Sequence, residues 1–170
     1  MPAGLKRSSA DFFISASVSE TAANTYTENE IVLPLDSLSR EVFVITGVIF
    51  NPATPSRIAG TETDVQVQLT RNSSRDMIPL SEYNLIAEAN ETVISLTDEG
   101  QLTGKAYGNK ILESGKDYLD IVATPNMYFA TQGNNNTNAT TSFMRVYGYR
   151  AVASVDTYSA LVASELNSGQ

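Results

Sequence analysis

Hydrophobic and polar residues alternate along most of this chain with a period of two, which is typical of β-strands that have one buried face. The alternation is clearest at 64–71 and is also present at 11–18. Residues 41–50 are instead apolar on both faces and rich in β-branched side chains, so they predict a central strand that is covered on both sides. Gly47 inside this run predicts a bulge or a close approach of another backbone segment.

Five further segments have strand character, and turn residues separate them from one another. The last segment alternates clearly, with Phe143, Arg145, Tyr147 and Tyr149 on one face. Residues 133–141 contain no large apolar side chain and predict a solvated loop between two strands. The five segments are 29–35, 92–97, 117–123, 126–131 and 142–152. About eight short strands without a crossover helix predict an all-β fold, an antiparallel sandwich or barrel.

One segment, 79–90, does not fit the alternating pattern. Pro79 and Ser81 are start signals for a short helix that would cross between two sheets. A strand from Tyr83 to Ala87 agrees with the same residues equally well, so the sequence leaves both structures open.

The C-terminal residues predict a short helix. Asp156 can cap its first turn, and its apolar positions form one stripe: Tyr158, Leu161, Val162 and Leu166. This stripe has two interpretations. It docks on its own sandwich and covers a sheet edge or end, or it inserts into a groove on a neighbouring subunit and is a partner-docking site. The sequence does not separate them.

The composition excludes several kinds of chemistry, because the chain contains no His, no Cys and no Trp. Without Cys and His there are no disulfides, thiolate nucleophiles, imidazole ligands or Ser-His-Asp triads. Phosphate-binding and nucleophile motifs are also absent from the sequence. We therefore predict a protein that is not an enzyme, with no catalytic residues, no metal-ligating residues and no cofactor. A calcium ion that bridges acidic loops of two subunits is the one metal role left open.

The charge balance limits the partners. The chain has 11 Lys and Arg against 19 Asp and Glu, a formal net charge of −8, and its only adjacent bases are Lys6 and Arg7. These two could contact a phosphate or a lipid headgroup, or simply belong to a solvated chain start. Strong direct binding of nucleic acid is not expected from so few clustered cations. No apolar run reaches the length of a transmembrane segment, and the first twenty residues lack a signal peptide.

The order of these elements resembles the single jelly-roll coat proteins of small icosahedral viruses. The shared features are a short N-terminal arm at 2–10, about eight strands, a proline-rich loop after a long apolar strand, and a C-terminal appendage. The resemblance covers 11–152 and rests on strand number and size. It implies an eight-stranded jelly roll and a shell built from many copies through loops, arms and sheet edges. The weakly basic arm departs from coat proteins that condense their genome.

We therefore predict three parts: an N-terminal arm at 1–10, a jelly-roll β-sandwich at 11–153 and a C-terminal helix or tail at 154–170. The predicted function is that of a structural protein that self-assembles into a virus particle shell, as a capsid, penton or decoration subunit. Its partners would be copies of itself and other virion proteins, and its location the virion, after synthesis in the host cytoplasm. The alternative is a β-sandwich module that recognises glycans or a host surface, which requires exposed tyrosines such as Tyr107, Tyr147 and Tyr149 on one sheet face.

Overall fold

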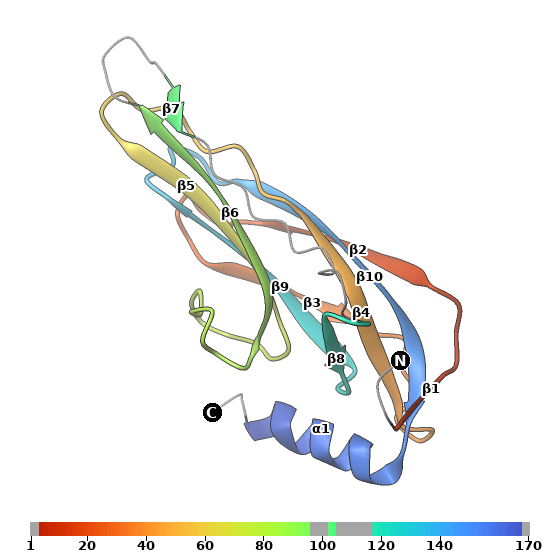
Figure 1. Ribbon diagram of the computed structural model, residues 1–170. Coiled ribbons are helices and arrows are strands. Elements are labelled where there is room, and N and C mark those ends of the chain that lie inside the picture. Colours follow the sequence, from red (N-terminus) through yellow and green to blue (C-terminus); the bar gives the residue numbers. More distant parts are fainter. Residues whose placement is uncertain (1–3, 96–101, 105–116, 168–170) are drawn as a thin grey trace.

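A computed structural model describes residues 4–95, 102–104 and 117–167, with 102–104 described by their backbone alone. Within them, ten strands precede one helix (Figure 1). The elements are β1 (Leu5–Arg7), β2 (Phe12–Ser19), β3 (Thr27–Val32), β4 (Glu41–Asn51), β5 (Glu62–Thr70), β6 (Leu85–Ser95), β7 (Leu102–Gly104), β8 (Asp120–Val122), β9 (Asn126–Asn134), β10 (Thr141–Ala153) and α1 (Val155–Asn167).

The strands form two antiparallel five-stranded sheets that pack face to face. Sheet A has the order β2–β10–β4–β8, and β1 pairs with the far end of β10 on the same side as β2. Sheet B has the order β3–β9–β5–β6–β7. From β2 to β10 the strands alternate between the sheets, apart from the consecutive strands β5, β6 and β7 of sheet B, and β2 lies beside β10. This is the strand order of a jelly roll, so the predicted all-β jelly-roll sandwich with a C-terminal helix is confirmed.

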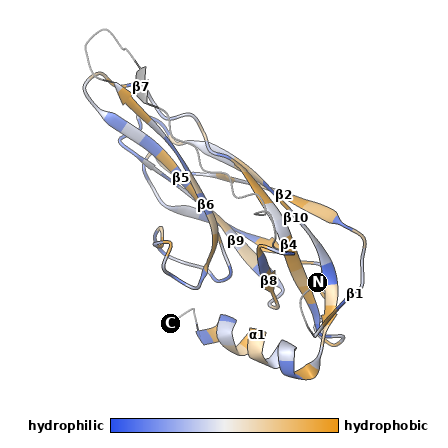
Figure 2. Cartoon of the chain, in the orientation of Figure 1, coloured by the Kyte–Doolittle hydropathy of each residue, from blue (hydrophilic) through white to orange (hydrophobic). Residues whose placement is uncertain are grey.

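The core lies between the sheets and is made by the alternating apolar residues that the sequence indicates. Phe43 and Phe129 are fully buried, and the Phe50 and Phe129 rings stack with their centroids 6.1 Å apart. In Figure 2, β4 has hydrophobic colour over most of its length, whereas β5 alternates between the two colours. Each fully buried side chain of this size contributes about 2–3 kcal/mol through removal of its apolar surface from water.

A bulge in β4 reverses the facing of its residues. The pairing with β10 shifts between Tyr147 and Gly148, which leaves Thr46 as the extra residue next to Gly47. Before the bulge Val44 faces outward, and after it Ile49 does so. The bulge predicted at Gly47 is therefore confirmed, and the close backbone approach occurs at Gly148. A Cβ there would lie 2.3 Å from the Val44 carbonyl oxygen.

Two local predictions need correction or completion. Segment 79–90 holds no helix, because residues 80–84 form turns and β6 begins at Leu85, so the strand interpretation is the better of the two. The 133–141 segment is only partly a solvated loop, since β9 runs to Asn134 and Asn136 is buried. The amide of Asn136 is satisfied by the backbone of Ser56 and Asp64, which is why a polar residue can be buried there.

The helix α1 lies across one end of the sandwich, at the same end as β1 (Figure 1). Its first turn is capped by Ser154, whose hydroxyl accepts a hydrogen bond from the Thr157 backbone nitrogen at 3.3 Å. Asp156 is the acidic residue of the first turn and not the cap, since the helix begins at Val155. An acidic side chain at this position still interacts favourably with the helix dipole.

Candidate interaction surface

The outer face of sheet A is divided into two halves by the β4 bulge. We call the half under α1 the covered half: it consists of Leu5, Val42, Val44, Tyr149, Ala151 and Ala153. We call the half beyond the bulge the open half: it consists of Phe13, Ser15, Ser17, Ile49, Asn51, Phe143, Arg145 and Tyr147. Both halves include outward rows of the central strands β4 and β10. β1 adds Leu5 to the covered half, and β2 adds Phe13, Ser15 and Ser17 to the open half.

The covered half is closed by the apolar stripe of α1. Tyr158, Leu161 and Val162 are half-buried and pack against Val42, Val44, Tyr149 and their neighbours. Leu166, the fourth residue predicted for the stripe, is 64% exposed and makes no part of this contact. In this structure the helix therefore lies against its own sandwich. Whether a second subunit also uses these residues stays a prediction.

A buried carboxylate fixes the end of the helix. Glu165 is fully buried, and its two oxygens accept hydrogen bonds from the backbone nitrogens of Ala123 at 2.7 Å and Thr124 at 2.9 Å. The Asn72 side chain also donates to the Glu165 carbonyl oxygen at 2.8 Å. Hydrogen bonds to an ionised acceptor are stronger than neutral ones, so this contact holds α1 in one position. The sequence analysis missed Glu165, although its spacing from Tyr158 and Leu161 puts it on the same helical face.

The open half presents apolar side chains to solvent. Phe13 is 55% exposed, Phe143 51% and Ile49 42%. The Phe13 and Tyr147 rings lie 6.1 Å apart, and the Arg145 guanidinium lies over the Phe13 ring at 4.5 Å from its centroid. Among the described residues, Arg145 has no ion-pair partner. The guanidinium can therefore pair with a carboxylate brought by another molecule while it stays stacked on Phe13.

Ile49, Phe143, Arg145 and Tyr147 line a shallow groove of about 490 Å³ that runs across β2, β4 and β10, and Phe13 lies beside it against Tyr147 and Arg145. Apart from Arg145, its polar groups are neutral: Ser15, Ser17, Asn51 and the Tyr147 hydroxyl. No carboxylate among the described residues lines it. Contiguous exposed apolar surface with a polar rim is typical of a binding or association site, so this groove is the candidate functional site of the chain.

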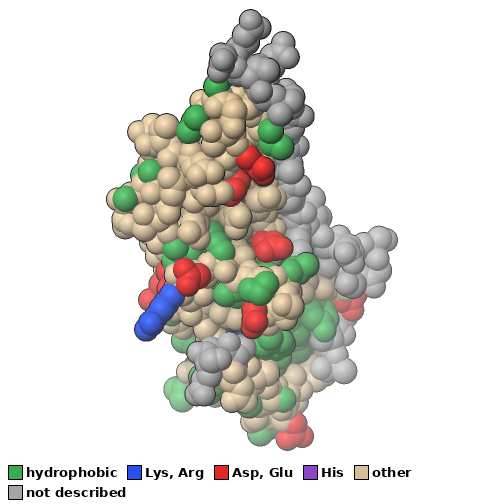
Figure 3. Space-filling view, turned by 90° about the vertical axis from the view of Figure 1, so that its left-hand side faces the viewer, with side chains coloured by type: hydrophobic (Ala, Val, Ile, Leu, Met, Phe, Trp, Pro, Cys, Tyr) green, Lys and Arg blue, Asp and Glu red, His purple; other side chains and the backbone are tan. Residues whose placement is uncertain are grey.

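The outer face of sheet B has a different character. Its outward rows include Glu28, Glu30, Gln66, Gln132 and Asn134. Figure 3 views the molecule from this side, where red carboxylate side chains are spread over the described surface and blue ones are scarce. The phenol of Tyr26 donates to the Glu28 carboxylate at 2.9 Å, and burial together with that charge raises the pKa of Tyr26 well above its ordinary value. Sheet B thus supplies the negative surface of the molecule.

The loops at one end of the sandwich are tied by a second buried carboxylate. Glu20 accepts hydrogen bonds from the backbone nitrogens of Gly133 at 2.7 Å, Thr140 at 2.8 Å and Thr25 at 3.2 Å. Asn136 adds hydrogen bonds between its own backbone and the Asn24 side chain. This polar network fixes the loops at this end of the sandwich. The Asn-rich segment 133–141 therefore has a structural role.

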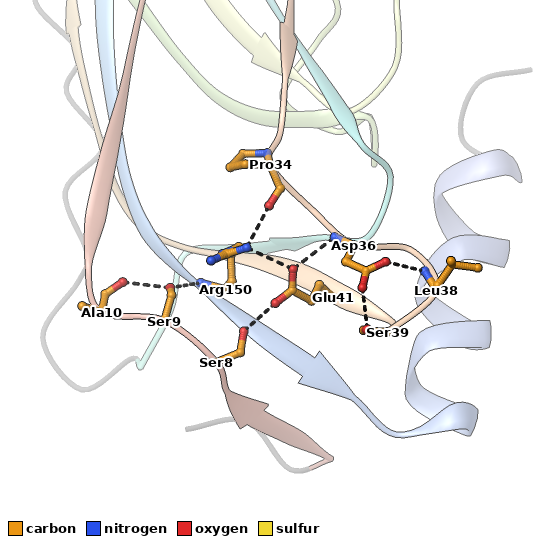
Figure 4. Close-up of polar contacts among 9 residues, drawn as sticks. All are labelled: Ser8, Ser9, Ala10, Pro34, Asp36, Leu38, Ser39, Glu41 and Arg150. Atoms are coloured by element: carbon orange, nitrogen blue, oxygen red, sulfur yellow. Dashed lines mark hydrogen bonds and ion pairs between the residues drawn. The ribbon is translucent and has the colours of Figure 1, made fainter.

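The turn between β3 and β4 is also held firmly (Figure 4). The Asp36 carboxylate accepts hydrogen bonds from the Leu38 backbone nitrogen at 3.0 Å and the Ser39 hydroxyl at 2.5 Å. These hydrogen bonds, that of Ser39 first, lower the pKa of Asp36 below its ordinary value. At the base of the turn, Glu41 accepts from the Asp36 backbone nitrogen at 3.1 Å and from Arg150 at 3.3 Å. Leu38, at the tip, is 95% exposed.

The two cations of the predicted N-terminal contact lie on β1. Arg7 is engaged inside the molecule: it forms an ion pair with Asp11 at 2.9 Å, and its guanidinium lies over the Tyr149 ring at 4.4 Å. Lys6 is exposed. The structure therefore separates their roles, with Arg7 tied to the covered half and Lys6 facing solvent. Whether either contacts a phosphate or a headgroup stays a prediction.

The tyrosines proposed for a glycan platform do not gather on one exposed surface. Tyr149 is buried in the covered half, and burial raises its pKa against the opposing effect of the Arg7 charge. Tyr147 is half-buried at the open half, and Tyr107 lies outside the described residues. The aromatic ring beside Tyr147 is that of Phe13, at 6.1 Å between centroids.

The described part of the chain lacks two further features. It contains no group of three or more Asp or Glu side chains placed to hold a metal ion. Nor does any helix within it have the length and apolarity needed to cross a membrane.

Comparisons with known proteins show which solved structures share this fold. No protein-family model matches the sequence, and a search of curated proteins finds no relative. Solved structures do match. VP1 of chimpanzee polyomavirus has a TM-score of 0.53 at 5% identity, and the alignment covers 88% of this chain and 99% of that one. VP1 of Trichodysplasia spinulosa-associated polyomavirus, in complex with sialylated glycooligomers, has a TM-score of 0.52 at 6% identity, with 88% and 98% covered.

A third match is the same VP1 in complex with GM1 oligosaccharide, with a TM-score of 0.51 at 7% identity and 85% and 96% of the two chains covered. The alignments span nearly the whole of each viral chain, so the likeness includes both sheets and not a fragment of one. At such low identity the likeness establishes architecture and leaves open the role of each residue. The chain therefore resembles viral capsid proteins of the jelly-roll type in fold, as its sequence predicted.

Proposed function

We propose that this chain is a structural, non-enzymatic subunit that self-assembles into the shell of a virus particle. The observation that carries the proposal is the open half of sheet A, an exposed apolar groove on the outer face of a jelly-roll sandwich. A monomer that works alone would be expected to cover such a face, and this chain does cover the other half of the same face with α1.

The fold and the composition support the same function. The solved structures that match are viral capsid proteins, and the chain has no His or Cys with which to build common catalytic sites. Subunits of a shell act through complementary surfaces, which fits a molecule whose buried polar groups serve to fix loops and a helix. Its partners would be copies of itself and other virion proteins, its location the virion, and it would need no cofactor.

Sedimentation velocity over a wide range of protein concentration tests this function, with electron microscopy of the concentrated sample. We expect reversible association into species of defined size, and closed rings or shells on the grid. Phe143→Asp would abolish the association without loss of the fold, because Phe143 is half-exposed. A chain that stays monomeric up to millimolar concentration at several values of pH and ionic strength would contradict the proposal.

A second candidate function is recognition of acidic glycans by the same groove. It is favoured by one arrangement, the Arg145 guanidinium beside Phe13, Tyr147, Ser15 and Ser17, since a guanidinium can bind a sugar carboxylate while aromatic rings contact its apolar face. Titration of the monomer with 3′-sialyllactose, and with lactose as the uncharged control, tests it. Binding of the first sugar alone, lost in Arg145→Gln, would favour this function over assembly.

A further inference from the structure

The open half of sheet A has a complementary feature elsewhere on the same molecule. It requires an occupant with an apolar side chain to fill the groove and a carboxylate to pair with Arg145, since no carboxylate lines the groove itself. The 36–40 turn has both: Leu38, with the largest exposed fraction among the exposed large hydrophobic side chains of the described residues, and the exposed carboxylate of Asp36.

We propose that the 36–40 turn of one copy inserts into the open half of sheet A of a second copy, with Leu38 against Phe13, Ile49 and Phe143 and with Asp36 paired to Arg145. This inference rests on the proposed function, because it names the contact through which copies associate. The groove spans three strands, and the turn has a single exposed leucine at its tip that can enter it. The apolar contact would provide affinity and the ion pair would fix the orientation.

The turn is organised before any contact is made. Its tip is held by the Leu38 and Ser39 hydrogen bonds to Asp36, by the Arg40 backbone nitrogen donating to the Ser37 carbonyl oxygen at 3.1 Å, and by the left-handed Arg40 with φ 56°. Its base is held by Glu41, which accepts hydrogen bonds from the Asp36 backbone, Ser8 and Arg150 (Figure 4). Because the backbone of the turn is already fixed, binding needs to order only the Leu38 side chain, so the entropy lost is small and a single leucine can act as an anchor.

Charge distinguishes this contact from a symmetric one. If the open half of one copy packed on the open half of another about a two-fold axis, two Arg145 guanidinium groups would approach with no carboxylate in the groove to separate them. The turn brings Asp36 instead. The other charged residue of the turn, Arg40, is half-buried at its base, and its carbonyl oxygen accepts from the Ala153 backbone nitrogen. The negative group is therefore the one at the exposed side.

The two surfaces of this contact are different, so each copy has one turn and one groove to offer. Such head-to-tail contacts generate a ring when the rotation between copies closes, and an open filament when it does not. The proposed contact thus leads directly to assemblies of many copies, as a shell subunit requires.

Disulfide trapping tests the contact, and the chain suits it because it contains no Cys of its own. One tagged chain would have Leu38→Cys and a second, with a different tag, Phe143→Cys. After mixing at a concentration where the wild type associates, we expect the mixed disulfide as the main product. The control pair, Leu80→Cys with Phe143→Cys, uses another leucine that is 63% exposed and should give about tenfold less. Equal yields from the two pairs would overturn the inference.

A charge exchange provides the second test. Arg145→Glu or Asp36→Arg alone should weaken association by about tenfold. The double variant should associate more tightly than either single variant, but below the wild-type level, because Asp36→Arg also removes the acceptors that hold Leu38 and Ser39. Asp36→Asn keeps an oxygen that can accept from Leu38 and should weaken association less than Asp36→Arg does. Melting curves of the dilute monomers would show whether each variant folds.

The outcomes separate this inference from the proposed function. A wild-type chain that never associates contradicts both. A wild-type chain that associates, while the double variant is no better than the single ones and the Leu38–Phe143 disulfide does not form, contradicts the inference alone and leaves a shell subunit with another interface. A Phe143–Phe143 disulfide as the main product would contradict the head-to-tail contact in favour of a symmetric one.

Discussion

The two halves of the outer face of sheet A share the strands β4 and β10 and both have apolar side chains, yet among the described elements a helix covers only one of them. The covered half has small residues, Ala151 and Ala153, at the rows where α1 approaches, and one buried carboxylate, Glu165, that fixes the helix. The open half has large rings, Phe13 and Phe143, with a cation and no covering element among the described residues. The difference indicates that one half serves the monomer and the other serves contact with another molecule.

The largest effect is expected at the boundary between the halves. Gly148→Ala should lower the free energy of unfolding by about 3 kcal/mol, because the new Cβ would lie 2.3 Å from the Val44 carbonyl oxygen and 2.7 Å from the Phe43 ring. Gly47→Ala is the matched control in the same bulge: nothing lies within 4 Å of its Cβ, and the change should stay within about 1 kcal/mol. Urea denaturation measures both. A Gly148→Ala variant as stable as Gly47→Ala would show that the bulge geometry is wrong.

The next effect concerns the covered half. Glu165→Gln should lower the free energy of unfolding by about 2 kcal/mol, because the buried side chain loses its charge and one of its two acceptors for the Ala123 and Thr124 nitrogens. Amide hydrogen exchange should show α1 opening before the sandwich does. Leu166→Gln is the control on the exposed side of the same turn and should change stability by less than about 0.5 kcal/mol. Equal effects of the two substitutions would contradict a helix held by Glu165.

A direct comparison of the halves uses one truncation in each. Leu161→Ala removes a half-buried contact with the covered half and should lower the free energy of unfolding of the monomer by about 1.5 kcal/mol. Phe143→Ala removes a ring that is 51% exposed and should lower it by no more than about 0.5 kcal/mol, while weakening association. The two variants should therefore separate stability from assembly. A Phe143→Ala monomer destabilised as much as Leu161→Ala would place that ring in the core.

The smallest effect is expected from the titration of Asp36. Its pKa is lowered in the folded chain, so its ionised form adds stability above the ordinary Asp range and that stability is lost as the pH falls through the lowered value. Asp36→Asn should thus be slightly less stable than the wild type at pH 6. The difference should begin to shrink as the pH falls below the ordinary Asp value of 3.8, and should disappear only below the lowered pKa of the folded chain. Thermal melts from pH 2 to pH 6 measure it. A stability difference that grows as the pH falls would contradict a lowered pKa of Asp36.

The architecture follows from the sequence because its main determinant is local. The period of two at 11–18 and 64–71 is imposed by strand geometry. The apolar run at 41–50 predicted a strand covered on both faces, which holds for β4 only before the bulge: α1 packs over Val42 and Val44, whereas Ile49 beyond it is exposed. Gly47 inside that strand predicts the bulge, because a glycine in a strand interior often marks an irregularity in the pairing. Phe143, Arg145 and Tyr147 were also placed on one face by alternation alone.

The rest of the site depends on contacts between residues distant in sequence. Glu165 can be buried because the backbone nitrogens of Ala123 and Thr124 donate hydrogen bonds to its carboxylate. No local sequence pattern predicts this contact. Asn136 has the same dependence on Ser56 and Asp64. Tyr149 and Tyr147 lie two residues apart on one face, yet α1 covers only the first. The helical spacing from Tyr158 could have predicted part of this, because it puts position 165 on the buried side of the helix.

Hydroxyl-radical footprinting of the separated monomeric and associated fractions tests the central claim, that the open half is the contact surface and the covered half is not. We expect the oxidation of Phe13, Phe143 and Leu38 to fall several-fold on association. The oxidation of Tyr158 and Val162 should stay unchanged. Equal reactivity of Phe13 and Phe143 in both fractions, with protection of Tyr158 instead, would contradict it and identify α1 as the interface.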